Sequence, residues 1–265
     1  MDENIKKLIN TAVAKIIDKT SSDAKMEHLQ GKHDVKIHFT PKRYRIFGGI
    51  LQSMNIQFGN FIEELIKLLI ENDERYTILT KYSGKKSNSF ELSSKNETLI
   101  DNYISNCQLQ PDGFCFEQFP IRQKNILLDK DTNKNTFKHD IDLLFKNNQT
   151  GLIYYLEIKY NDDHDTGKFV DINRKFIKTY AYLTKELNIT DSSNLVPILF
   201  FFTNKKMKGN NYIPESTNIR RGKKFFEEFL TVKYEDVDSY LLDLSESSET
   251  IKQFNDLYEK TMKLK

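Results

Sequence analysis

The chain has 265 residues and a mass of 31.2 kDa, which is enough for one large domain or two small ones. It contains 19 Phe and 13 Tyr, and this apolar area excludes an intrinsically disordered protein, because burying it offsets chain entropy. A formal charge of only +2 excludes a histone-like polycation, so any nucleic-acid surface must come from local clusters of basic residues. The longest apolar run, residues 195–202, is far shorter than the ~18–20 residues of a membrane-spanning helix.

The sequence also indicates a reduced, cytoplasmic protein. Its N-terminus begins Met-Asp-Glu-Asn and lacks the basic start and apolar stretch of a secretory signal. Two cysteines, Cys107 and Cys115, can form neither a disulfide framework nor a zinc site of standard spacing. The abundance of Lys, Asn and Ile is typical of AT-rich bacterial genomes, which favours a bacterial source.

The first hundred residues contain predicted helices. Asp2 can cap a helix that runs through about Lys19, and the apolar residues of this segment follow helical spacing. A polar stretch, residues 20–36, and a basic segment, residues 41–45, lead to a helix over residues 60–71 that is apolar over most of its surface and should be buried. Residues 81–95 are predicted to be a polar loop, and residues 97–106 a further helix.

The period then changes to that of strands. Residues 137–145 and 151–160 are predicted to be strands joined by a polar turn, and residues 195–202 to be a buried strand. Helical patterns cover residues 168–187, 216–230 and 249–262. This order predicts a mixed α/β (α+β) core with its strands in the middle of the chain.

The segment that indicates chemistry pairs acidic residues across two of these strands. Asp140 and Asp142 lie two positions apart, as do Glu157 and Lys159, so each pair should share one face of its strand. Antiparallel pairing through the short turn would bring an acidic group and a lysine together. Charges are costly in such buried strands unless they pair or bind a metal, and hard carboxylate oxygens suit Mg²⁺.

The strand context matters more than the tripeptide Glu157-Ile158-Lys159. The pattern of an acid, any residue and Lys occurs three times in the sequence, whereas about 5 occurrences are expected by chance. Only this occurrence lies in an apolar strand that follows a second acidic strand.

With these residues the chain resembles the PD-(D/E)XK nuclease superfamily, and its size resembles that of a type II restriction endonuclease. The resemblance implies a mixed four- to five-stranded sheet flanked by helices, in the order αβββαβ. It implies one nuclease domain with an N-terminal helical and basic region (1–58), a catalytic core (59–205) and a C-terminal recognition extension (206–265). The position before the acid holds His139 or Ile141 instead of proline, so either Asp140 or Asp142 could be the catalytic aspartate.

The resemblance also implies roles for individual residues. Asp142 and Glu157 would bind Mg²⁺, with the Ile158 carbonyl as a further ligand, and Lys159 would orient and help deprotonate the attacking water. A glutamate on the helix before the first core strand, Glu63 or Glu64, would match another position that the superfamily often uses.

Several basic segments are candidates for DNA contact. Residues 218–224 place four cations near a predicted helix start, where they oppose the helix dipole, so phosphate contact or guanine readout explains them better than helix stability does. The alternative is a solvated basic face. The candidate residues are Arg220, Arg221, Lys223, Lys205, Lys206, Lys168, Arg43 and Arg45.

Two other patterns are less specific. Residues 161–168 do not match a calcium loop, and they form either a solvated turn that caps the next helix or a loop that touches DNA or a second metal. His28, His33 and His38 recur every five residues, which fits neither a helix face nor a strand face, and we interpret them as surface residues.

Together these features predict a Mg²⁺-dependent type II restriction endonuclease that cuts double-stranded DNA as a homodimer, because a two-fold dimer matches a palindromic target. Two alternatives remain open from the sequence: a repair or junction-resolving nuclease of the same superfamily, and a DNA-binding protein whose acidic residues are structural.

Overall fold

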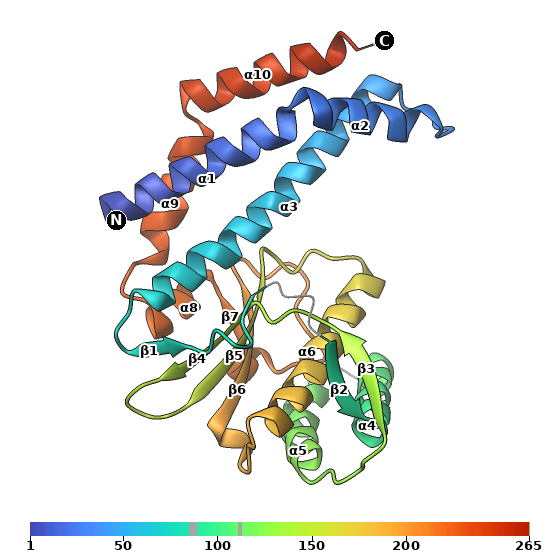
Figure 1. Ribbon diagram of the computed structural model, residues 1–265, viewed down its shortest axis with the longest axis vertical. Helices are drawn as coiled ribbons and strands as arrows, with labels where there is room; N and C mark the ends of the chain where they lie inside the picture. Colours follow the sequence, from blue (N-terminus) through green and yellow to red (C-terminus); the bar gives the residue numbers. More distant parts are fainter. Residues whose placement is uncertain (85–88, 111–112, 265) are drawn as a thin grey trace. The chain divides into compact units, whose positions relative to one another are not determined.

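The computed structural model describes residues 1–84, 89–110 and 113–264, which fold into two compact units (Figure 1). The first comprises Met1–Glu64 with the chain from Val232 onward, and the second comprises Leu65–Thr231. None of the helices in these described residues is long and apolar enough to cross a membrane.

The first unit is helical. Asp2 caps its first helix as predicted, because its carboxylate accepts a hydrogen bond from the Asn4 N–H. The polar stretch 20–36 contains a second helix that was not predicted, which Ser22 caps and in which Met26 and Leu29 are buried. The helices of this unit are α1 (Glu3–Ser21), α2 (Asp23–Asp34), the first part of α3 (Lys42–Glu71), α9 (Tyr234–Ser245) and α10 (Ser248–Met262).

The second unit contains a five-stranded mixed sheet in the order β1-β4-β5-β6-β7, which confirms the predicted mixed α/β fold. The strand β4 is antiparallel to both β1 and β5, whereas β5, β6 and β7 run parallel. The start of β4 therefore lies at the same edge of the sheet as the carboxyl ends of β5, β6 and β7 (Figure 1). The strands are β1 (Tyr76–Ile78), β4 (Leu143–Asn147), β5 (Ile153–Lys159), β6 (Leu195–Phe201) and β7 (Ile219–Arg221).

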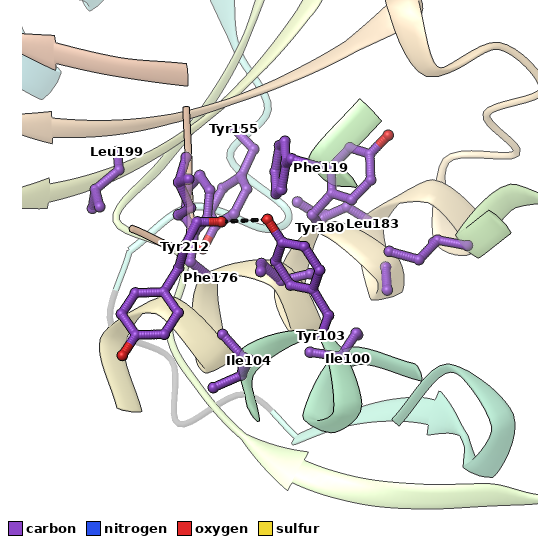
Figure 2. Close-up of a cluster of buried hydrophobic side chains, with 14 of the residues drawn as sticks. Ile100, Tyr103, Ile104, Phe119, Tyr155, Phe176, Tyr180, Leu183, Leu199 and Tyr212 are labelled. Carbon is purple, nitrogen blue, oxygen red and sulfur yellow. Dashed lines mark hydrogen bonds between the residues drawn. The ribbon is translucent and has the colours of Figure 1, made fainter. Parts of the chain in front are cut away.

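Aromatic side chains anchor helices to this sheet. The ring of Tyr155 on β5 stacks on Phe176 with a centroid distance of 5.1 Å, in a core where the Tyr103 hydroxyl donates to the Tyr212 carbonyl at 2.7 Å (Figure 2). Phe200 on β6 stacks on Phe225. The remaining elements are a small sheet of β2 (Ser89–Ser93) and β3 (Lys134–Lys138), the helices α4 (Ser94–Leu109), α5 (Phe114–Leu127), α6 (Thr166–Glu186), α7 (Glu215–Asn218) and α8 (Gly222–Phe229), and a 3-10 turn at Ser192–Asn194.

Several predicted elements are wrong in type or extent. The expected strand over residues 137–145 is two strands in different sheets, since β3 pairs with β2 and β4 pairs with β1 and β5. The expected helix over residues 216–230 is interrupted by β7, which pairs in parallel with β6. The predicted loop 81–95 contains β2, and no helix was predicted where α5 and α9 lie.

Candidate active site

Two chain segments bring three of the predicted catalytic residues together at the edge where β5 ends. Glu157 and Lys159 lie on β5, and Asp142 lies in the bend just before β4, the antiparallel neighbour of β5. The Asp142 carboxylate accepts a hydrogen bond from the Ile158 N–H at 2.7 Å. This bond fixes the aspartate against the strand that bears the other two residues.

The ammonium of Lys159 lies at the centre of this group, and Asp142, Glu157, Ile158 and Lys159 are called the acidic cluster below. Lys159 Nζ lies 2.7 Å from Glu157 Oε1, 2.8 Å from the Ile158 carbonyl oxygen and 3.4 Å from Asp142 Oδ2. Three oxygens therefore converge on one cation, and they come from the three residues that the sequence predicted as metal ligands.

Glu157 is held in a buried but polar environment. Its side chain is only 5% exposed, and its second carboxylate oxygen lies 3.2 Å from both the Tyr155 hydroxyl and His139 Nε2. Burial alone would raise the pKa of Glu157, but the positive charge of Lys159 and the hydrogen bond from His139 outweigh burial and lower the pKa to about 2. Glu157 is therefore ionised at neutral pH, which is the state that a metal ligand needs.

The donor set suits a hard divalent cation. Mg²⁺ typically uses one or two protein carboxylates and completes its shell with water and phosphate oxygens, and Asp142 and Glu157 with the Ile158 carbonyl provide such a set. Across residues 1–84, 89–110 and 113–264, no group of three or more His, Cys, Asp or Glu residues could hold a metal by itself. The residues present fit a site that substrate oxygens complete.

The other two predicted catalytic acids do not lie on strands of the five-stranded sheet. Asp140 does not share a strand with Asp142, because both residues lie in the crossing between β3 and β4, and Asp140 is half-buried there. Glu63 lies in α3, within the part of that helix that belongs to the helical unit.

Four of the residues predicted to contact DNA follow the carboxyl ends of the parallel strands. Lys168 is in the first turn of α6, after β5, and Lys205 and Lys206 lie in the loop after β6. Lys223 follows β7, and its backbone N–H donates to Asn204 in that loop. All four lysines are exposed, and they belong to the same edge of the sheet as the acidic cluster.

The surroundings of Arg220 and Arg221 differ from the prediction. Both lie on β7 instead of near the start of one long helix, and their side chains are only 11% and 12% exposed. Arg220 forms a short ion pair with Glu228, while Arg221 pairs with Asp162 at 3.0 Å and with Glu215 at 2.8 Å. The helix-dipole argument made from the sequence therefore does not apply to them.

The last two basic candidates lie on α3 in the helical unit. Arg43 is exposed, whereas Arg45 is half-buried and its guanidinium donates to the carbonyl oxygens of His33 and Lys36, each at 3.3 Å. These bonds tie the start of α3 to the end of α2 and the segment that follows it.

The acidic loop after β5 is only partly the predicted turn. Asp165 caps α6 by accepting from the Lys168 N–H, so the helix-capping interpretation is confirmed, with the helix beginning at Thr166. Asp162 is not solvated, because its side chain has no exposed surface and pairs with Arg221. The interpretation of the segment as a solvated turn is wrong at this residue.

Two residues that contact Glu157 had no role in the sequence prediction. Tyr155 lies two positions before Glu157 on the same strand, so the strand period was an available signal for it. His139 lies outside any strand, and its approach to Glu157 depends on the path of the chain between β3 and β4, for which the sequence has no local signal.

Comparison with known proteins shows the family of the chain. Residues 1–245 match the family described as "Type II restriction endonuclease, HinfI". The chain is 61% identical over 265 residues to the type II restriction enzyme HinfI of Haemophilus influenzae, and the match covers the whole of both chains. No solved structure gave a significant match.

Proposed function

The chain belongs to the HinfI family of type II restriction endonucleases, and from this premise we propose that it cleaves double-stranded DNA at a short specific sequence with the acidic cluster as its Mg²⁺-dependent catalytic centre. The observation that carries this assignment is the convergence of Asp142, Glu157 and the Ile158 carbonyl on the position of Lys159 Nζ. Family membership favours a restriction enzyme over the repair nuclease and the non-catalytic DNA-binding protein that the sequence left open.

The fold supports a PD-(D/E)XK core around this site. The helix α3 is followed by β1, β4 and β5, which form an antiparallel series, and then by α6 and β6. This is the αβββαβ order that the resemblance implies, with β2, α4, α5 and β3 inserted after the first strand. Glu63 on α3 stays a candidate for the helix glutamate of that core.

Each residue of the acidic cluster has a role that its surroundings support. Asp142 and Glu157 would hold Mg²⁺ together with the Ile158 carbonyl, and the bound ion would supply positive charge next to the scissile phosphate and the leaving oxygen. Lys159 is 22% exposed, so its ammonium can reach the solvent side of the cluster and orient the attacking water there. The hydrogen bonds from Tyr155 and His139 hold Glu157 in place.

The exposed lysines at the same edge support the DNA contact. Lys168, Lys205, Lys206 and Lys223 lie in segments that follow β5, β6 and β7, and cations in this arrangement would neutralise backbone phosphates on either side of the scissile bond. Arg220 and Arg221 would reach DNA only by exchanging their present ion pairs. We propose a homodimer as the active form, since a two-fold axis places two catalytic centres on the two strands of a palindrome.

The proposal is tested by incubating supercoiled plasmid and a sequenced phage genome with the protein, with and without Mg²⁺. Discrete fragments that need Mg²⁺, with ends that map to one short sequence, are expected. The Lys159→Ala variant, purified in parallel, controls for contaminating nucleases. Random degradation would contradict a site-specific enzyme, and intact DNA in the presence of Mg²⁺ would contradict an active nuclease.

A further inference from the structure

A pocket of about 590 Å³ lies between α2 and α3 in the helical unit, and none of its lining residues belongs to the unit that carries the acidic cluster. Its walls come from α2, the segment after it and the first half of α3. No Asp or Glu lines the pocket, while four of its residues are permanently charged cations: Lys25, Lys32, Lys36 and Arg45.

These cations lack the compensation that other surface lysines of this unit have. In the described part of the chain, none of the four lies within 4.0 Å of a carboxylate, whereas the nearby Lys42 pairs with Asp34 at 2.8 Å and Lys260 pairs with Asp23 at 2.7 Å. Like charges gathered in one concave site repel one another unless an anion binds among them. The arrangement therefore favours an anionic ligand.

The half-buried His33 lies in the same positively charged surroundings. Burial is the largest cause that lowers the pKa of His33, and the positive charges of Arg45, Lys36 and Lys32 lower it further. The Nδ1 atom of His33 and the Nε atom of Arg45 are buried without a hydrogen-bond partner among the described residues. The pocket is thus polar and positively charged, and it has buried nitrogen atoms that lack hydrogen-bond partners among the described residues.

The backbone of α3 leaves room for a ligand at this place. Gly48 and Gly49 lie inside the helix, where glycine costs roughly 1 kcal/mol relative to alanine. A Cβ at Gly49 would lie 3.1 Å from Leu29, so packing against α2 accounts for that glycine. A Cβ at Gly48 would meet nothing within 4 Å, so packing does not account for that one, and its missing side chain widens the pocket.

From these observations we propose that the pocket between α2 and α3 is a second, non-catalytic DNA-binding site that takes the phosphodiester backbone of the duplex. This inference rests on the proposed function, because a restriction endonuclease must hold a polyanionic duplex while it searches for its target. The pocket makes its contribution through charge, so it should add affinity for any sequence and no discrimination between sequences.

The test measures binding in the absence of divalent metal, so that no cleavage occurs. The Lys32→Ala/Lys36→Ala variant removes two exposed pocket cations, and the Lys7→Ala/Lys15→Ala variant removes two exposed lysines of α1 in the same unit as a matched control. Affinity for a fluorescent target duplex and for a non-target duplex is determined by anisotropy at several salt concentrations. Cleavage of saturating target DNA with Mg²⁺ is measured separately for every variant.

We expect the pocket variant to bind both duplexes about 10-fold more weakly at 0.1 M salt, and the slope of log affinity against log salt to fall by about 2. Its cleavage rate at saturating DNA should equal that of the wild type, and the control should match the wild type throughout. Equal affinity and slope in the pocket variant and the control would overturn the pocket proposal while leaving the proposed function intact. A wild-type protein that neither binds nor cleaves DNA would overturn both.

Soluble phosphate compounds carry the same anionic groups as DNA, and binding measurements with a nucleoside triphosphate distinguish the two kinds of ligand. If a nucleoside triphosphate binds the wild type but not the pocket variant, and the two proteins have the same salt slope for DNA, the pocket belongs to a soluble phosphate ligand and the proposal fails.

Discussion

The guanidinium of Arg221 lies 3.0 Å from the carboxylate of Asp162, whose side chain has no surface exposed to solvent. The same carboxylate accepts backbone hydrogen bonds from residues 207–209, and Arg221 also pairs with Glu215. One aspartate therefore joins the segments that follow β5, β6 and β7. Because these segments carry the lysines proposed to contact DNA, this buried ion pair shapes the edge of the candidate active site.

The first prediction concerns the stability that this ion pair provides. Asp162→Ala leaves the buried Arg221 with Glu215 alone and removes the acceptor of three backbone N–H groups, so we expect a loss of about 3 kcal/mol in the free energy of unfolding. The matched control is Asp163→Ala, an exposed neighbour that should change stability by less than about 0.5 kcal/mol. Urea unfolding measures both values, and equal stabilities for the two variants would contradict the assignment.

Asp162 should also make the free energy of unfolding depend on pH. Burial raises the pKa of Asp162, but hydrogen bonds from Gly209 and Met207 and the charge of Arg221 outweigh burial and hold the pKa below its ordinary value of 3.8. A depressed pKa means that the stabilisation is fully present above pH 3.8 and is lost as the pH falls through the lower folded-state value. Asp162→Asn should therefore flatten the decline in unfolding free energy at acid pH.

A second prediction tests the acidic cluster itself. Glu157→Ala and Lys159→Ala should abolish specific cleavage, with a loss of about 10²–10⁴-fold for the lysine as a proton-transfer and water-orienting group, while DNA binding changes little. Single-turnover cleavage and anisotropy binding measure the two effects separately. Wild-type cleavage rates in either variant would move the catalytic centre elsewhere.

The choice between the two aspartates is a third prediction. Asp142 contacts β5 directly through the Ile158 N–H and Lys159, whereas Asp140 lies two residues earlier in the crossing between the sheets. Asp142→Asn should therefore lower the cleavage rate far more than Asp140→Asn, and the ranking is read from parallel rate measurements at saturating Mg²⁺. The reverse ranking would shift the metal-binding aspartate by two residues.

The sequence predicted the central strands of the fold better than the connections between them. The segment from Phe137 to Phe145 contains no Gly or Pro that would mark a break, yet the chain leaves one sheet and enters another within it. Ile141 is fully buried in this crossing, so an apolar residue occupies a position that belongs to neither strand. Likewise, β7 has only three residues, too few for a period, and it exists because it pairs with β6.

The sequence predicted those parts of the candidate site that depend on strand periodicity and on residues that lie close together along the chain. Glu157 and Lys159 share one strand, and the adjacent β4 brings Asp142 to them across a short turn. The partners of the arginines were not predictable in this way. Arg221 and Asp162 are 59 positions apart, and their contact exists only in the folded sheet.

A fourth prediction concerns Tyr155, whose buried hydroxyl donates a hydrogen bond to Glu157. Tyr155→Phe removes only the hydroxyl that lies 3.2 Å from Glu157 Oε2, so the ring stack on Phe176 is kept. Outer-shell partners of metal ligands typically contribute about 10–100-fold to metal affinity, and the Mg²⁺ concentration for half-maximal cleavage should rise accordingly. Tyr154→Phe, on the same strand, is the control. Direct Mg²⁺ binding by calorimetry should show the same shift, and an unchanged Mg²⁺ requirement would assign Tyr155 to packing alone.

The fifth prediction distinguishes the exposed lysines near the sheet edge from the largely buried Arg220. Lys205 and Lys206 are exposed, so Lys205→Ala/Lys206→Ala should weaken binding evenly across sequences and lower the salt slope by about 2. Arg220 is largely buried in its ion pair with Glu228, so Arg220→Ala should mainly lower the unfolding free energy. Both variants are measured against target and one-base-changed duplexes at two salt concentrations, alongside urea unfolding. If Arg220→Ala keeps wild-type stability and loses about 1–3 kcal/mol of discrimination at one base pair, then Arg220 exchanges its glutamate for a guanine when the target binds.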